Sequence, residues 1–297
     1  MSAAATVEVG GRRLALSNLD KVLWPATGFT KGEMVDYYAR IAPVMLPHLA
    51  DRPVTLRRWP DGVEAGSFFE KHCPSHRPEW VPTITQGKVA ACAIAEPAAL
   101  VWTANLAAVE LHPTLATAPE LERPRSVVLD LDPGPPADLL SCARVAMLLR
   151  ALLDRLGLAV WAKTSGSKGL QLYVPTNTPV GYDQTRELAL GLARLVEGAH
   201  PDLVVTTQDR RARPGKVLID WSQNHPTKTT VCVYSLRAWR TPSVSAPVTW
   251  EELEEALEDE DGERLRFSPG AVLSRVAEWG DLLEPVLHVE QELPRLG

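Results

Sequence analysis

The stretch that decides the fold is SVVLDLDPG, residues 126–134. Its apolar and β-branched residues predict a strand over 126–132, which ends where the chain reaches Pro133-Gly134. Alternate side chains of a strand share one face, so Asp130 and Asp132 point the same way. Two neighbouring carboxylates repel each other, which favours a bound cation. A solvated strand end is the alternative, but the apolar neighbours indicate a buried strand.

A third carboxylate follows from KVLIDWSQN, residues 216–224. Asp220 closes the apolar run of a strand predicted over 216–220. Alone this is a weak signal, because an aspartate at a strand end often begins a turn. Together with Asp130 and Asp132 it completes a set of oxygen ligands that suits Mg²⁺ or Mn²⁺.

The segment KTSGSKGLQLYVP, residues 163–175, predicts a glycine-containing loop between two strands. Gly166 and Gly169 permit a tight turn, while Ser165 and Lys168 supply a hydroxyl and a positive charge. Such a loop can hold phosphate groups with its backbone N–H groups. The spacing differs from that of a Walker loop, and an ordinary β-turn with an exposed lysine is the alternative.

The remaining chain alternates irregularly between helices and strands, which predicts an α+β fold. A capping box at Thr30 and Glu33 predicts a helix that begins at Lys31, and Thr249 with Glu252 predicts another. Further helices are expected over 97–111, 138–156 and 183–199 and from Ser268, and further strands over 54–58, 159–163 and 170–174.

Composition places few limits on function. The 297 residues carry a net charge of −6, but acidic residues concentrate in 251–263, which leaves room for local basic patches. We expect a flexible tail over residues 1–12 and a single domain over 13–297. Neither a signal peptide nor an apolar run of about 20 residues is apparent, so we expect a cytoplasmic protein without membrane contact.

The four cysteines, at positions 73, 92, 142 and 232, form no CxxC pair, so the sequence suggests neither a disulfide framework nor a zinc ribbon. His72, Cys73 and His76 lie close together and raise the possibility of a structural zinc ion. Because a fourth ligand at suitable spacing is not apparent, an ordinary loop is the favoured interpretation.

In this order, the DLD pair, SGSKG and IDWSQN resemble the three motifs of archaeo-eukaryotic primase-polymerases. The chain is most similar to the bacterial polymerase domain that accompanies ATP-dependent DNA ligase D. The likeness covers nearly the whole chain and includes LSNLDKVLWP (16–25), RPVTLRRWPDG (52–62), FFEKHCPSHRPEW (68–80), VWTANLAAVELH (101–112), KTTVCVYSLRAW (228–239) and GDLLEP (280–285).

The resemblance implies an RRM-like catalytic sheet flanked by helices and a metal-dependent transfer of nucleotides to a primer 3′-OH on a DNA template. It implies two divalent metal ions, Mn²⁺ or Mg²⁺, and a preference for ribonucleotides. The implied partners are NTP or dNTP, gapped or broken duplex DNA with a 5′-phosphate, an ATP-dependent DNA ligase and Ku.

The resemblance also assigns roles to individual positions. The metal-binding residues are Asp130, Asp132 and Asp220. The nucleotide-binding residues are Arg57, Phe69, His112, Ser165, Lys168, Gln171, Gln223 and Arg237. Asn18, Lys21 and Lys31 match the pocket for a downstream 5′-phosphate, Phe68 and Phe69 match a pair that stacks near the templating base, and Arg213 matches a loop arginine that helps the active site become competent.

Two features depart from the family pattern. Gln171 stands where the family usually has a histidine that helps bind the triphosphate, and glutamine cannot carry a charge. The segment 83–97 is shorter than the loop with which end-joining members pair two broken ends. That shortening resembles the branch associated with ligase C, called primase-polymerase C, which favours short gaps.

Two other classes of function remain open from the sequence. A non-catalytic protein that binds DNA ends or gaps would bind gapped DNA without extending it. A phosphodiesterase or nuclease with the same carboxylates would shorten strands and need no nucleotide.

Overall fold

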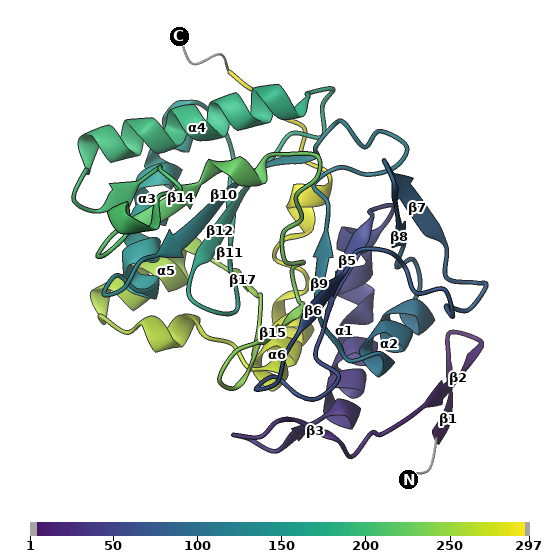
Figure 1. Cartoon of the computed structure of the whole chain (residues 1–297). Helices are drawn as coiled ribbons and strands as arrows, with labels where there is room; N and C mark the ends of the chain where they lie inside the picture. Colours follow the sequence, from purple (N-terminus) through teal and green to yellow (C-terminus); the bar gives the residue numbers. More distant parts are fainter. Residues whose placement is uncertain (1–4, 295–297) are drawn as a thin grey trace. The chain divides into compact units, whose positions relative to one another are not determined.

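The computed structural model describes residues 5–294, and the strand predicted from SVVLDLDPG lies inside a six-stranded sheet (Figure 1). The strands follow the order β13 (Val204–Val205), β14 (Val217–Asp220), β10 (Ser126–Pro133), β12 (Leu170–Pro175), β11 (Trp161–Thr164) and β17 (Pro247–Val248). All neighbours are antiparallel except β13 and β14, which are parallel. Val127, Leu129 and Leu131 are completely buried, which explains why β10 takes an interior position.

Helices α3 (Leu139–Arg155) and α4 (Tyr182–Ala199) both contact β10 and also contact each other, so they cover the same face of this sheet. Helix α3 begins at the N-cap Asp138, whose side chain accepts a hydrogen bond from the Ser141 N–H. Helix α5 (Trp250–Glu258) packs on α3 and begins with the capping box predicted at Thr249.

A second sheet has five strands, in which β5 (Val54–Arg58) is hydrogen-bonded to three neighbours. These neighbours are β6 (Phe68–Glu70), β8 (Val89–Cys92) and β9 (Ala108–Pro113), and β7 (Thr83–Gln86) pairs with β8. Helix α1 (Lys31–Leu49) begins with the predicted capping box and contacts α2 (Pro97–Asn105) and α6 (Pro269–Trp279). Two short antiparallel pairs complete this part, β3 (Val22–Trp24) with β4 (Phe29–Thr30) and β15 (Leu236–Ala238) with β16 (Pro242–Val244).

The two sheets belong to two compact units, each assembled from separate segments of the chain. The first unit comprises the chain up to Pro119 together with 229–245 and 268–280. The second comprises 120–228 and 246–267 and the chain from Asp281 onward. The expectation of one domain over 13–297 stays a prediction.

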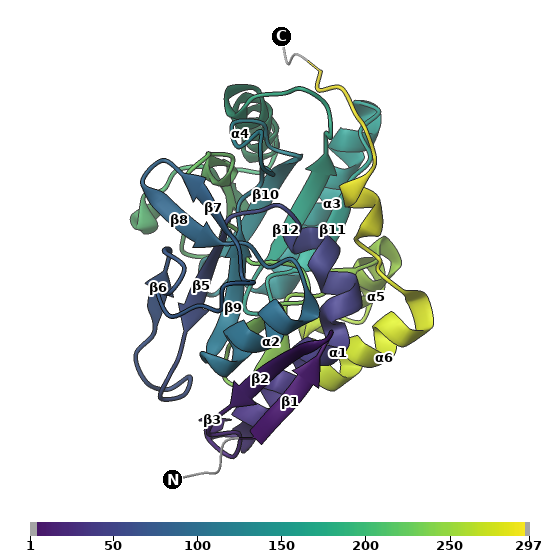
Figure 2. The same cartoon turned by 90° about the vertical axis from the view of Figure 1, so that its right-hand side faces the viewer.

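The expected flexible tail is wrong for residues 5–12, and residues 1–4 lie outside the described part. β1 (Ala5–Val9) and β2 (Arg12–Leu16) form an antiparallel hairpin that contacts α2 (Figure 2). Gly10 and Gly11 have φ angles of 55° and 78°, which the two-residue turn between the strands requires. Leu14 and Leu16 are buried, so the hairpin is held by apolar packing as well as by its backbone hydrogen bonds.

Two further expectations are corrected. The segment 97–111 is not one helix, because α2 ends at Asn105 and the chain continues into β9. The structure pairs Cys73 with Cys92 in a disulfide although the sequence suggested no such framework. The backbone N–H of Cys73 donates to the Ala90 carbonyl, and this contact between segments 19 residues apart brings the two cysteines together. Because Cys73 is in the disulfide, the structure also argues against the zinc interpretation.

Candidate active site

The three predicted metal-binding aspartates lie on two neighbouring strands of the second unit. Asp130 on β10 stands directly opposite Asp220 on β14, and its partner on the other side is Gln171 of β12. Asp220 is buried, Asp130 is half-buried and Asp132 is exposed. Like charges directly opposite each other in a sheet are destabilising. A cation bound between Asp130 and Asp220 would reduce this repulsion.

Burial and the neighbouring carboxylates both favour the neutral form of Asp130. Burial raises the pKa of Asp130 well above its usual range, and the charges of Asp132 and Asp220 raise it further. A hydrogen bond from Gln171 and the charge of Lys163 act in the opposite direction without cancelling the rise. A divalent cation beside these carboxylates would lower the pKa of Asp130 by favouring its charged form.

Asp130 is connected to a buried lysine through Gln171. The Gln171 Nε2 donates to Asp130 Oδ1 at 3.1 Å, and the Lys163 Nζ donates to Gln171 Oε1 at 2.6 Å. Lys163 is completely buried, which makes it a candidate functional residue that the sequence reasoning missed. The sequence did contain a signal for Lys163, because a charged residue stands inside a short predicted strand between two turns.

Asp220 is held by several donors. Its Oδ1 accepts from the Ser222 N–H at 2.9 Å, the Ser222 hydroxyl at 2.5 Å and the Gln208 Nε2 at 3.0 Å, and its Oδ2 accepts from the Gln223 Nε2 at 3.2 Å. Arg213 donates to both the backbone carbonyl and Oε1 of Gln208, at 2.9 and 3.0 Å. The predicted residues Arg213 and Gln223 therefore belong to the surroundings of Asp220.

The three carboxylates offer oxygen ligands, which hard cations such as Mg²⁺ and Mn²⁺ prefer. A cation between them would also reduce the repulsion between their negative charges. Over residues 5–294, however, the structure contains no group of three His, Cys, Asp or Glu side chains at the separation of a metal cluster. Asp220 is engaged by its own donors and Asp130 by Gln171, so the joint role of the three in metal binding stays a prediction.

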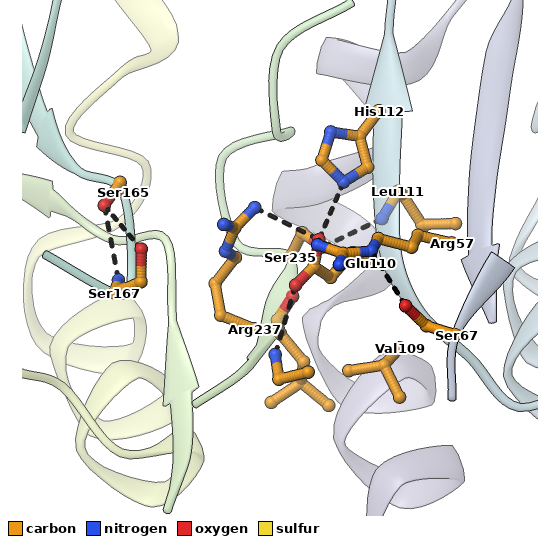
Figure 3. A network of polar contacts seen from close by, with 12 residues as sticks. Arg57, Ser67, Val109, Glu110, Leu111, His112, Ser165, Ser167, Ser235 and Arg237 are labelled. Carbon is orange, nitrogen blue, oxygen red and sulfur yellow. Dashed lines mark hydrogen bonds and ion pairs between the residues drawn. The ribbon is translucent and has the colours of Figure 1, made fainter. Parts of the chain in front are cut away.

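The glycine loop after β11 folds back on its own backbone. Ser165 Oγ accepts from the Ser167 N–H at 3.3 Å and lies 3.2 Å from the Ser167 hydroxyl (Figure 3). It also accepts from the Gly169 N–H at 3.1 Å. A Cβ atom on Gly169 would lie 2.0 Å from the Leu131 carbonyl oxygen, so only glycine fits at this position. Ser165 is buried and Lys168 is exposed. The loop is therefore packed tightly against the strand that carries Asp130.

In the first unit, three predicted nucleotide-binding residues converge on one carboxylate that the sequence reasoning missed. Arg57, His112 and Arg237 contact Glu110 Oε2 at 3.4, 2.9 and 3.2 Å (Figure 3). The Glu110 side chain is only 2% exposed. Burial raises its pKa, but the hydrogen bond from His112 and the charges of Arg237 and Arg57 outweigh that effect and bring the pKa to about 2. The signal for Glu110 was a single acidic residue inside the apolar run AVELHP.

Phe68 and Phe69 are exposed aromatic residues on β6, with exposed fractions of 45% and 54%. The guanidinium carbon of Arg57 lies 4.9 Å from the centroid of the Phe69 ring, and that ring meets His112 edge-on at 5.7 Å. Arg58 lies 5.3 Å from the centroid of Phe68. The structure thus brings Phe69 beside Arg57 and His112 and exposes an aromatic surface on which a base could stack.

The residues of the predicted 5′-phosphate pocket lie around one turn in the first unit. The Lys21 N–H donates to the Asn18 carbonyl at 3.0 Å, and the Lys31 N–H donates to the Lys21 carbonyl at 2.8 Å. The Lys31 ammonium is buried and donates to the Ser17 carbonyl at 2.6 Å, whereas Lys21 pairs with the exposed Asp61 at 2.9 Å. Burial lowers the pKa of Lys31 to about 8, and the charges of Lys21 and Arg58 contribute.

The sequence matches the family "LigD, primase-polymerase domain" over residues 30–283, and the chain belongs to this family of nucleotidyltransferases. It is 43% identical over 280 residues to the multifunctional non-homologous end joining protein LigD of Mycolicibacterium smegmatis, covering 92% of this chain and 36% of that protein. It is 32% identical over 246 residues to the bifunctional LigD of Bacillus subtilis, covering 82% of this chain and 40% of that protein. The chain therefore spans little more than a third of the length of these relatives.

The structure is similar to a polymerase domain from Mycobacterium tuberculosis ligase D in complex with DNA, with a TM-score of 0.85 and 40% identity over 94% of this chain and 99% of that chain. This match confirms the predicted α+β fold of the archaeo-eukaryotic primase type. Within the described residues, no helix combines the length and the apolar character needed to cross a membrane.

Proposed function

We propose that this chain is a DNA-repair primase-polymerase that extends a primer 3′-OH on a DNA template at short gaps or broken ends. In this reaction the 3′-oxygen attacks the α-phosphate of a nucleotide and pyrophosphate leaves. The observation that carries the proposal is the direct pairing of Asp130 with Asp220 across β10 and β14, with Asp132 on the same strand as Asp130. Family membership and the likeness to a DNA-bound polymerase domain support it.

Asp130, Asp132 and Asp220 would hold two divalent metal ions, Mn²⁺ or Mg²⁺. Bound metal would supply activation of the 3′-hydroxyl and stabilisation of the leaving pyrophosphate. The residues proposed to bind the nucleotide, preferentially a ribonucleotide, are Ser165, Lys168, Gln171, Gln223, Arg57, Phe69, His112 and Arg237. The Nε of Arg237, which is buried without a hydrogen-bond partner among residues 5–294, supports a role in binding an acceptor. Arg213 would help the site become competent, through its contacts with Gln208.

Asn18, Lys21 and Lys31 would bind a downstream 5′-phosphate, and Phe68 would stack near the templating base. Their common turn and the exposed aromatic surface support these roles. The short β7–β8 hairpin supports gap filling within one duplex over the pairing of two broken ends. We further propose that the chain acts with an ATP-dependent DNA ligase and Ku on cytoplasmic, nucleoid-associated DNA.

A primer-extension assay tests this function. Wild-type protein is mixed with Mn²⁺, ribonucleotides and a labelled primer annealed beside a short gap that carries a downstream 5′-phosphate. We expect the primer to lengthen by the number of nucleotides in the gap, and only when both metal and nucleotide are present. Binding without lengthening would indicate a non-catalytic gap-binding protein. Shortening of the labelled strand without nucleotide would indicate a nuclease.

A further inference from the structure

Glu110 is a buried carboxylate at the meeting point of three strands. It lies on β9 within an apolar strand, and its side chain is 2% exposed. A buried charge is costly unless it is paired and hydrogen-bonded. Here Oε2 accepts from Arg57, His112 and Arg237, and Oε1 accepts from the Ala238 N–H at 3.2 Å.

The contacts follow from the register of the strands. Arg57 on β5 stands directly opposite Glu110. His112 lies two residues farther along β9, so it shares the face of Glu110. Arg237 comes from β15, and the adjoining N–H of Ala238 also donates to Glu110, which fixes the backbone next to that arginine.

We propose that Glu110 is a positioning residue that holds Arg57, His112 and Arg237 in the orientation in which they bind the incoming nucleotide. This inference rests on the proposed function, because it takes these three side chains as part of the nucleotide site. Glu110 is too buried to contact the nucleotide, so it acts through the three residues that surround it. Without its carboxylate, two guanidinium groups would be left close together without the anion between them.

Glu110 also fixes the protonation of His112. A carboxylate accepts hydrogen bonds, so the contact at 2.9 Å requires a proton on His112 Nε2. Burial lowers the pKa of His112, and Glu110 offsets this only in part. The ring is therefore neutral near pH 7, and its Nδ1 is a hydrogen-bond acceptor.

Removing the Glu110 carboxylate should change nucleotide affinity in opposite directions under two explanations of its role. If Glu110 merely reduced the positive charge available to a triphosphate, its removal would tighten nucleotide binding. If it positions the three side chains, its removal weakens binding although the local positive charge increases. Glu110→Asp adds a second distinction, because it keeps the charge but shortens the side chain.

The experiment compares wild type, Glu110→Gln, Glu110→Asp and Glu70→Gln. The last is a matched control, since Glu70 is a carboxylate of the same sheet whose ion pair, at 2.8 Å, is with Arg58 and not with one of the three residues. ATP binding is measured by equilibrium titration, and kcat and KM are measured in Mn²⁺-dependent gap extension. We expect both Glu110 variants to raise the Kd and the KM about tenfold or more with little change in kcat. We expect the control to stay within about twofold of wild type.

Unchanged or tighter ATP binding by folded Glu110→Gln would overturn the inference while leaving the proposed function intact. Failure of wild type to bind ATP would overturn the proposed function and the inference with it. If the Glu110 variants do not fold, nitrogen NMR of wild-type protein tests the inference instead, by showing which ring nitrogen of His112 carries a proton. A neutral ring with its proton on Nε2 is expected, and a proton on Nδ1 with Nε2 unprotonated would overturn the inference.

Discussion

Replacing Gln171 with methionine tests the connection between Lys163 and Asp130. Methionine has a similar volume but lacks the amide that accepts from Lys163 at 2.6 Å and donates to Asp130 at 3.1 Å. The hydrogen bond from the charged Lys163 contributes about 1.5–3 kcal/mol, and the bond to Asp130, whose raised pKa favours its neutral form, contributes about 0.5–1.5 kcal/mol. Because both bonds belong to one network, their energies do not simply add, and we expect a loss of about 3 kcal/mol of unfolding free energy. For a protein of this size that lowers the Tm by about 6–12 °C.

Thermal unfolding and Mn²⁺ titration measure the two consequences of this change. Loss of the donor to Asp130 raises the pKa of this carboxyl further, so Mn²⁺ must displace a more tightly held proton and should bind more weakly. Gln208→Met is the matched control, because Gln208 links Arg213 to Asp220 in the same manner but is exposed. Its expected stability loss is below about 1 kcal/mol. Wild-type stability and wild-type Mn²⁺ affinity in Gln171→Met would refute the reasoning.

Three other changes give distinct outcomes. Gly169→Ala should displace the backbone of β10 and abolish extension, since its Cβ would lie 2.0 Å from a carbonyl oxygen; an active, fully stable variant in melting and extension assays would contradict this. Lys21→Ala should remove a preference for phosphorylated gaps in a DNA-binding titration, whereas Asp61→Asn, which frees Lys21, should strengthen that preference. In metal-free buffer, the raised pKa of Asp130 stabilises the folded state at acid pH, and this contribution is lost as the pH rises through that pKa. Denaturation at several pH values measures the unfolding free energy. As the pH rises through the pKa of Asp130, this free energy should fall less for Asp130→Asn than for wild type.

The elements that were predicted correctly have signals within a few residues of chain. The strand from Ser126 carries its apolar run and its terminating proline together, and the capping boxes at Thr30 and Thr249 span four residues each. The β1–β2 hairpin had a local signal too, the Gly10-Gly11 pair between two short runs that contain valine or leucine, and the sequence analysis did not use it.

The features that were missed depend on contacts between distant segments. Glu110 acquires its two arginine partners from β5 and β15, which no pattern near residue 110 indicates. Cys73 meets Cys92 through the pairing of chain segments, and Lys163 becomes buried because β11 lies inside a sheet. The predicted site residues themselves came largely from family resemblance, because strand alternation accounts for Asp130 and Asp132 but not for the nucleotide-binding set.

Extension by Asp132→Asn is the most direct test of the central claim that these carboxylates drive nucleotide transfer. Asp132 is exposed, so the substitution should leave the fold intact, and it removes one negative charge without changing the size of the side chain. Wild type and variant are compared on the same gapped DNA with Mn²⁺ and ribonucleotides, and DNA binding is measured in parallel. The account predicts that the variant binds the gap as wild type does but adds no nucleotide. Extension by Asp132→Asn at the wild-type rate would contradict it.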